Sequence, residues 1–248
     1  MNAFRAELLK ARTTRLLLWY AFALAAFLVF VVSVHVGTDE RFDLARLSTQ
    51  RSLFAISGLA AVVSVLVGSV LLASEYHHGT INQSLLAVPD RLRFLVAKFG
   101  AALVVGAALG VLGDVLVLVL GKLWYSGRGL TLQLGNGVAT PLLGTLAAAA
   151  LAAGVGLALA AILRRQTATI VIVLLWLLIG ENIIGISSRA APYAPGHVFG
   201  AIVAAHAHRS HDVLAAGPAT IVGIVYVAVL GVIGALVMLG SDAPAAGD

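Results

Sequence analysis

The residues of this chain best suited to metal chemistry are three histidines near its C-terminal end, His206, His208 and His211, which Asp212 follows. Imidazole and carboxylate groups bind zinc or copper where a folded scaffold holds them in place. The same His-x-His spacing is also typical of a solvated loop whose histidines titrate near neutral pH. Since the surrounding sequence offers no fixed scaffold, we expect a solvated loop here and no metal site.

Two carboxylates interrupt long apolar stretches, Asp114 and Glu181. A carboxylate at the centre of a bilayer costs roughly 2.5–3.5 kcal/mol on insertion scales, so Asp114 should face protein or water. It would then contact substrate along a translocation path or, the interpretation we favour, form a structural hydrogen bond to a neighbouring helix. Glu181 would line an outer vestibule along the same path, reach interfacial water or pair with Arg189.

The sequence lacks the motifs of the common enzymes that work in membranes. It has no cysteine, which excludes disulfides, thiolate metal ligands and cysteine nucleophiles. It has neither a His-Glu-x-x-His motif nor the two deep aspartates or Ser/His pair of an intramembrane protease. The nearest approach to a Gly-x-x-x-x-Gly-Lys-Ser/Thr phosphate loop is Gly121-Lys122, which lacks the first glycine. We therefore expect no catalytic site and no cofactor in this chain.

The composition places these residues in a lipid environment. Of 248 residues, 60% are hydrophobic and only 11% are charged, whereas soluble domains average about 25% charged residues. Mean hydropathy is +1.02 and the isoelectric point is near 10.0. In a membrane protein, basic residues at the cytoplasmic ends of spans explain such a value without nucleic acid, because they face anionic lipid.

Six apolar runs are long enough to cross a bilayer, which takes about 20 residues. We predict an all-α integral membrane protein that is a single transmembrane domain, with spans at 16–36, 53–73, 94–120, 139–163, 167–186 and 220–240. The flank before the first span carries four basic residues and one acid, which favours a cytoplasmic N-terminus. With six spans, both termini are then cytoplasmic.

The stretch between the second and third spans, "SEYHHGTINQSLLAVPDRLRF", is polar and patterned. Thr80 and Gln83 have the spacing of a capping box and predict a helix start. Ile81, Leu85 and Val88 fall on one face of that helix, which would end at Pro89. A helix this short needs a packing partner: the span ends, the lipid interface or another protein. Asp90 would cap the third span.

Three features together resemble the permease subunit of a type-2 ABC transporter, of the kind common in high-GC bacteria. "RAELLKARTTR" resembles the N-terminal cytoplasmic helix of that family, and we expect residues 1–15 to form an amphipathic interfacial helix. "SEYHHGTINQSLLAVPDRLRFLVAKFGA" resembles its most recognisable element. The third feature is the six-span layout, with a polar re-entrant or outer helical segment before the sixth span.

The resemblance implies a function for the patterned stretch. In such permeases the helix after the second span is a coupling helix that docks on a separate ATP-binding subunit. Here it would run from Glu75 to Val88, and the positions carried over or expected to contact the partner are Glu75, Tyr76, Gly79, Thr80, Ile81 and Leu85. The pair His77-His78 departs from the family, in which an arginine is common at this place.

The resemblance also implies partners and a location. ATP and magnesium would bind to the partner subunit, and a second permease copy or a homologue would complete the transporter. The complex would export an amphiphilic substrate, a drug, lipid or peptide, across the bacterial cytoplasmic membrane. The alternative is a motor-free membrane sensor or immunity protein that binds a ligand or metal through the outer histidine-rich loop. A capped cytoplasmic docking helix distinguishes the two, since a sensor does not require one.

Overall fold

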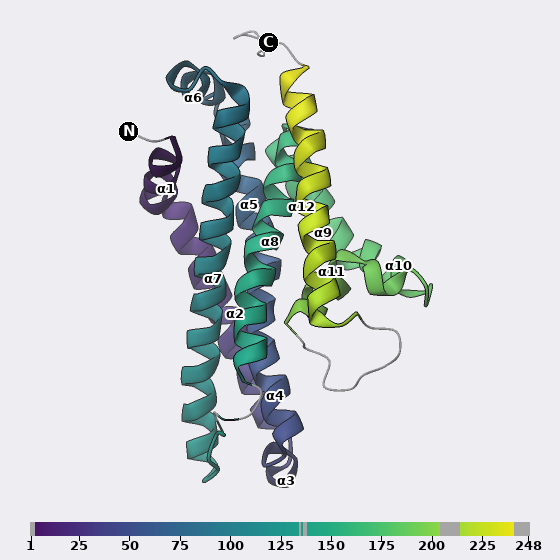
Figure 1. Ribbon diagram of the computed structural model, residues 1–248. Coiled ribbons are helices and arrows are strands. Elements are labelled where there is room, and N and C mark those ends of the chain that lie inside the picture. The colour runs from purple at the N-terminus through teal and green to yellow at the C-terminus, as the bar shows by residue number, and fades with distance from the viewer. Residues whose placement is uncertain (1–2, 134, 136–137, 204–213, 241–248) are drawn as a thin grey trace.

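The computed structural model describes residues 3–133, 135, 138–203 and 214–240, and within these ranges it contains helices and no strands. The long helices run side by side in one bundle (Figure 1). In chain order the elements are α1 (Ala3–Thr13), α2 (Arg15–Thr38), α3 (Arg41–Leu44), α4 (Leu47–Ala55), η1 (Ile56–Leu59), α5 (Ala60–His77), α6 (Ile81–Ala87), α7 (Arg91–Gly127), α8 (Ala139–Leu163), α9 (Gln166–Leu175), η2 (Trp176–Gly180), α10 (Glu181–Gly185), η3 (Ala191–Tyr193), α11 (Pro195–Ile202) and α12 (Ala216–Leu239).

Six helical segments in the described part are long and apolar enough to cross a membrane, as the sequence predicts. They are Leu17–Thr38, Leu47–His77, Arg91–Gly127, Ala139–Leu163, Gln166–Gly185 and Ala216–Leu239. The fourth coincides with its predicted range. The third is much longer than predicted: its 37 residues extend over about 55 Å, well beyond a hydrocarbon core of about 30 Å.

Two of the spans contain breaks in regular α-helix. In the second span, the 3₁₀ turn η1 separates α4 from α5, and in the fifth span the π-helical turn η2 separates α9 from α10. Such turns inside a helix often mark functional or strained positions. A run of apolar residues does not reveal them, so the sequence predicts both spans as uninterrupted.

Helix α8 forms the centre of the bundle and packs against α5, α7 and α12. Glycines allow the close approach. A Cβ added to Gly68 of α5 would meet the backbone carbonyl of Ala153, and one added to Gly106 of α7 would meet that of Ala149. A third contact of this kind joins Gly156 of α8 to the carbonyl of Val65. The small residues therefore pack helices within one chain.

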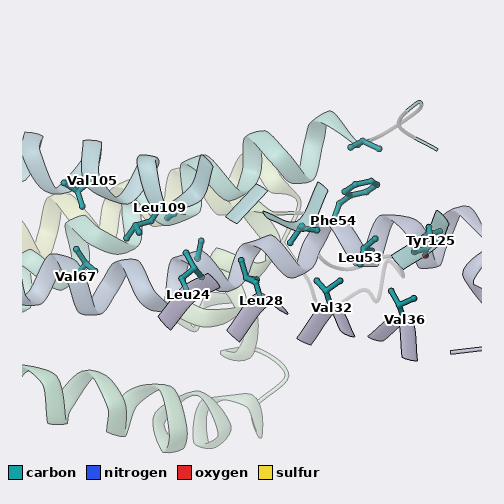
Figure 2. Close-up of a cluster of buried hydrophobic side chains, with 14 of the residues drawn as sticks. Leu24, Leu28, Val32, Val36, Leu53, Phe54, Val67, Val105, Leu109 and Tyr125 are labelled. Carbon is teal, nitrogen blue, oxygen red and sulfur yellow. The ribbon is translucent and has the colours of Figure 1, made fainter. Parts of the chain in front are cut away.

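Helix α2 packs along the outside of this centre through a single stripe. Leu24, Leu28, Val32 and Val36 recur at intervals of four residues and are fully buried. They point toward α4, α5 and α7 (Figure 2). The opposite face of α2 exposes large apolar side chains such as Phe22 (66% exposed). Such a surface fits contact with lipid rather than water.

The two ends of the bundle differ. Helices α1 and α6 and the last turns of α12 lie at the same end, whereas α3 and the start of α4 lie at the other (Figure 1). At the first end, Arg91 Nη1 donates to the carbonyl of Met238 at 3.0 Å, and the guanidinium of Arg164 donates to that of Val237. These arginines complement the negative end of the α12 helix dipole.

The segment before the sixth span forms the helix that the sequence predicts. Pro195 occupies the first turn of α11, where its missing N–H costs nothing. Val198, Ala201 and Ile202 are buried, and α11 packs on α12 and α8. Helix α10 projects sideways from the bundle, and α11 returns toward α12 (Figure 1).

Candidate functional site

The second and third spans are joined through a tight turn and the short helix α6. The chain leaves α5 at His77 and turns through His78 and Gly79. Gly79 has a φ of +67°, and no other atom lies within 4 Å of the place where its Cβ would be. Glycine adopts this left-handed conformation without steric cost. Glycine is therefore favoured at position 79 by the backbone conformation of the turn and not by a lack of space for a side chain.

The apolar face of α6 points into the protein. Ile81 is 3% exposed, and Leu85 and Val88 pack against the same buried cluster, which includes Phe94 of α7. Leu86, on the other face, is 82% exposed. Of the three packing partners that the sequence allows for this helix, the structure shows the span ends. A displacement of α6 would therefore move the spans with it.

The polar caps of this region follow the sequence only in part. Asp90 caps α7 as predicted: its Oδ1 accepts hydrogen bonds from the backbone N–H of Leu92 (3.0 Å) and Arg93 (3.1 Å). Thr80 occupies the N-cap of α6, but its side chain makes no capping hydrogen bond. Its ψ of −6° is helical, not extended as in most N-caps. The predicted capping box with Gln83 is therefore wrong.

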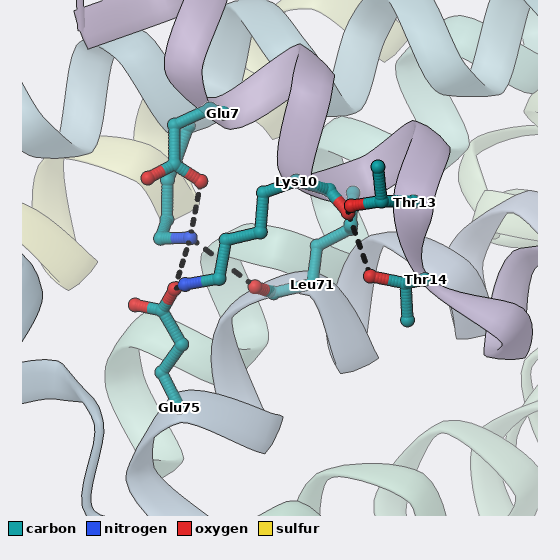
Figure 3. A network of polar contacts seen from close by, with 7 residues as sticks. Glu7, Lys10, Thr13, Thr14, Leu71 and Glu75 are labelled. Carbon is teal, nitrogen blue, oxygen red and sulfur yellow. Dashed lines mark hydrogen bonds and ion pairs between the residues drawn. The ribbon is translucent and has the colours of Figure 1, made fainter.

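A cluster of four buried or half-buried charges lies between α1, α5 and α7 (Figure 3). Lys98 of α7 donates to Glu7 Oε2 of α1 at 2.7 Å and to Glu75 Oε1 of α5 at 3.0 Å. It also donates to the carbonyl of Leu71 at 3.3 Å. Lys10 of α1 pairs with the same oxygen of Glu75. We call Glu7, Lys10, Glu75 and Lys98 the charge cluster.

The charge cluster balances two carboxylates with two ammonium groups. The side chains of Glu75 and Lys98 are 2% and 3% exposed, whereas that of Lys10 is 48% exposed. Burying charges costs several kcal/mol per ion unless each finds a partner, and a balanced set meets this condition. The contacts join α1, α5 and α7, so the N-terminal helix is fastened directly to the second and third spans.

The implied coupling helix from Glu75 to Val88 is divided by the structure. Glu75 and Tyr76 belong to α5, and α6 covers only Ile81–Ala87. Glu75 is buried as a member of the charge cluster, and Tyr76 packs with Ile81 and Leu85 in one apolar cluster. Gly79 is exposed and Thr80 is half-buried. Of the implied contact residues, only Gly79 lies fully at the surface.

Sequence reasoning missed three of the four members of the charge cluster. Glu7 and Lys10 fall within residues 1–15, which the sequence predicts to be an interfacial helix, and no local sequence pattern singles out Lys98. One signal was present: Lys98 and Glu75 are opposite charges at the adjoining ends of consecutive spans. Charged residues within or at the ends of spans usually pair with one another, so an ion pair between Lys98 and Glu75 could have been predicted.

Asp114 lies among packed helices. Its carboxyl faces the hydroxyls of Ser57 in η1 and Thr145 in α8, which lie 2.8 Å from one another. Asp114 is 9% exposed, and its Oδ1 has no hydrogen-bond partner in the described part of the chain. The carboxyl therefore joins the break in the second span to α7 and α8, an arrangement that suits a structural role.

Glu181 lies on the wall of a cavity of about 890 Å³, which Asp114 does not line. One carboxylate oxygen accepts hydrogen bonds from Trp176 Nε1 and from the backbone N–H of Gly196, both at 2.7 Å. The other lies 3.4 Å from His197 Nδ1. No ion pair with Arg189 is present in the described ranges, so that predicted pairing is wrong. Glu181 instead ties the fifth span to the start of α11.

The candidate metal ligands His206, His208 and His211 lie outside the described residues. Among the residues that are described, no group of three or more His, Cys, Asp or Glu side chains has the arrangement of a metal site. The charge cluster and Glu181 are thus the polar centres on which a functional interpretation rests.

The fold and these centres define a multi-pass helical membrane protein. Its short helix α6 packs on the span ends at the end of the bundle where α1 and the last turns of α12 also lie. Residues 3–180 match the family described as ABC-2 family transporter protein. The chain therefore belongs to this family and is a transmembrane subunit of an ABC transporter. No curated protein matches the sequence.

Proposed function

We propose that the chain is the transmembrane subunit of an exporter that moves an amphiphilic substrate outward across the bacterial cytoplasmic membrane. A separate ATP-binding subunit would supply the energy and hold ATP and magnesium, since the sequence has no phosphate loop. It would dock at the end of the bundle that carries α1 and α6, which is then the cytoplasmic end. This family member would itself catalyse no reaction.

The charge cluster is the observation that carries the proposal. Lys98 contacts both Glu7 and Glu75, and thereby connects α1 and α7 to the last turn of α5, from which the chain continues to α6. A force applied to α6 would reach the spans by two routes: the buried apolar face of α6 and the turn that leads to Glu75. Rigid movement of packed helices is a common way to transmit such a change.

The surface offered to the partner differs from the one that the family resemblance implies. Since Glu75, Ile81 and Leu85 point inward, contact would be made by the exposed side chains around them. These include His77, His78, Gln83 and Leu86. Leu86, at 82% exposure, is the most prominent apolar side chain of α6. A few side chains that become fully buried contribute most of the affinity of a protein interface, and we propose that Leu86 is one of them here.

Six spans would form half of the transporter, so we propose that two permease copies, or this chain and a homologue, assemble around the substrate path. ATP binding and hydrolysis on the partners would favour alternate conformations of the pair. The glycine contacts of α5, α7 and α8 are occupied within the chain, so the surface between copies would use other faces.

The test is purification of the tagged chain in mild detergent with mass spectrometry of copurifying proteins. Leu86→Asp should release the ATP-binding subunit, because it places a charge in the proposed contact. The matched control is Leu47→Asp, a half-exposed leucine at the other end of the bundle, which should retain it. Full retention of the subunit and of stimulated ATP turnover by Leu86→Asp would refute docking at α6.

A further inference from the structure

Residues of five of the six spans and of α11 line the cavity beside Glu181. Apolar side chains line most of it, among them Val65 of α5, Val155 and Leu159 of α8, Val173 of α9 and Leu230 of α12. Its volume of about 890 Å³ lies within the range of about 300–1,000 Å³ that is usual for small-molecule sites. A chamber of this size and lining, at the depth of the spans, would attract an apolar molecule from the bilayer.

The polar groups of the cavity lie toward one side of it. The lining residues of the fifth span run from Ile172, near the end shared with α6, to Glu181 and Ile184 further away. Tyr193 and Tyr226 also line the cavity, and the hydroxyl of Tyr226 donates to the carbonyl of Tyr193. Glu181, Tyr193 and Tyr226 thus give the cavity a polar region toward the far end of the fifth span. Apolar residues of α5, α8 and α9 line the part nearer α6, and apolar residues of α4 and η1 line it elsewhere.

Glu181 does not require a charged ligand. Its two carboxylate oxygens already face three nitrogen atoms, those of Trp176 Nε1, the Gly196 backbone and His197 Nδ1. Buried polar groups that have partners cost little, so the cavity needs no cation to complete it. Its polar side can still offer hydrogen bonds to a head group.

The fifth span lines the cavity with one face and exposes the opposite face. Val173 is 3% exposed, whereas Val171, two residues earlier on α9, is 46% exposed and does not line the cavity. The π turn η2 interrupts this wall beside Trp176, and α10 projects away from the bundle (Figure 1). The interrupted helix of the fifth span is therefore one part of the cavity wall whose outer face is exposed to lipid.

We infer that the cavity binds an amphiphile with one alkyl chain, the chain lying between α5, α8 and α12 and the head group beside Glu181 and Tyr193. The ligand would reach it sideways from the bilayer past α9 and η2. This rests on the proposed function and deepens it, because it names the substrate class and places a binding site within one copy of the chain. With the α6 end in the cytoplasm, the bound ligand has the orientation that an exported amphiphile takes in the outer leaflet, so the same route past α9 and η2 would release it there.

The test uses Trp176 as the reporter, since it lines the cavity and the chain has three tryptophans. With Trp19→Phe and Trp124→Phe, the full chain is placed in phosphatidylcholine nanodiscs and titrated with dodecyl maltoside brominated in its alkyl chain. The expected result is saturable quenching of Trp176 that unbrominated dodecyl maltoside reverses. Phosphatidylcholine brominated in its chains should give only weak, unsaturable quenching.

Two valines on one helix provide a matched pair. Val173→Phe would fill the cavity and should raise the half-saturating concentration about tenfold, a loss of roughly 1.4 kcal/mol of binding. Val171→Phe should leave it unchanged. Val65→Phe fills the cavity from α5 and serves where Val173→Phe does not fold. The half-saturating concentrations of the Val173→Phe and Val65→Phe variants are measured only on monodisperse protein.

Equal, unsaturable quenching in the Val173→Phe and Val171→Phe variants would overturn the inference, because Trp176 would then report only the surrounding bilayer. Saturable quenching by brominated phosphatidylcholine would overturn the one-chain assignment. The titration contains no ATP-binding subunit, so its outcome is independent of the copurification experiment. Failure of docking at α6 and failure of this site are therefore separate results.

Discussion

The ammonium of Lys98 lies 3.0 Å from a carboxylate oxygen of Glu75, and both side chains are almost completely buried. The two residues come from α7 and α5, the helices on either side of α6. The same ammonium lies 2.7 Å from Glu7 of α1. One side chain therefore holds three helices together near the end of the bundle that carries α6, and any movement of α1, α5 and α7 against one another would alter its contacts.

We expect Lys98→Met to destabilise the protein by about 3–5 kcal/mol, because removing one partner of a buried ion pair leaves charge uncompensated. Glu7 would lose its partner, and Glu75 would keep only Lys10. The measurement is the fraction of monodisperse protein that survives a series of temperatures in mild detergent. Adding Glu7→Gln should recover part of the loss, since it neutralises the carboxylate that Lys98→Met leaves without a partner.

The matched control for this change is Lys122→Met, at an exposed lysine near the other end of the same helix. Substitutions at such positions usually change stability by less than about 0.5 kcal/mol. Equal thermal losses for Lys98→Met and Lys122→Met would show that the charge cluster does not stabilise the bundle.

Substitutions at Gly79 should change the conformation of the α5–α6 turn and leave the fold of the bundle unchanged. Gly79→Pro cannot adopt a φ of +67°, so the α5–α6 turn must change. It should abolish stimulation of the ATP-binding subunit and leave membrane insertion intact. Gly79→Asn should retain most of the stimulation, because asparagine tolerates the left-handed region best after glycine. Equal activity of the two variants would show that this turn does not couple the subunits.

The number and type of spans could be predicted from the sequence because bilayer thickness imposes a simple length rule on apolar runs. The fourth span, flanked by loops and by Arg164, coincides with its predicted range. The third was underestimated because Lys122 and Tyr125 ended the apolar run although the helix continues to Gly127. Hydropathy shows which part of a helix lies in lipid, but it does not show where the backbone hydrogen bonds of the helix end.

The candidate site was harder to predict, because its parts are distant in sequence. Lys98 and Glu7 are separated by 91 positions, and no local pattern links them. The spacing of Ile81, Leu85 and Val88 gave the apolar face of α6 correctly, but periodicity does not say what covers such a face. Here the span ends cover it, which leaves Leu86 for a partner.

Asp114→Asn should distinguish a structural carboxyl from one on the substrate path. The amide keeps the size of the side chain and can hydrogen-bond to the hydroxyls of Ser57 and Thr145 that Asp114 faces. We therefore expect near-normal stability and transport. Asp114→Leu should lower stability by about 0.5–1.5 kcal/mol, since the hydroxyls lose the polar side chain that they face but keep each other and the carbonyls of Phe54 and Pro141. Loss of transport in a stable Asp114→Asn protein would instead place the carboxylate on the translocation path.

The same substitution at two glycines should change stability in opposite directions. Alanine exceeds glycine in helix propensity by about 0.8–1.0 kcal/mol, and at Gly37 of α2 the new methyl group would meet no atom within 4 Å. Gly37→Ala should therefore raise the thermal midpoint in detergent. At Gly156 the methyl group would meet the carbonyl of Val65 and lie 2.9 Å from Ser69 N. Overpacking of about 1–3 kcal/mol should outweigh the propensity gain, so Gly156→Ala should lower the midpoint. A rise in both variants would mean that α5 and α8 are not in backbone contact there.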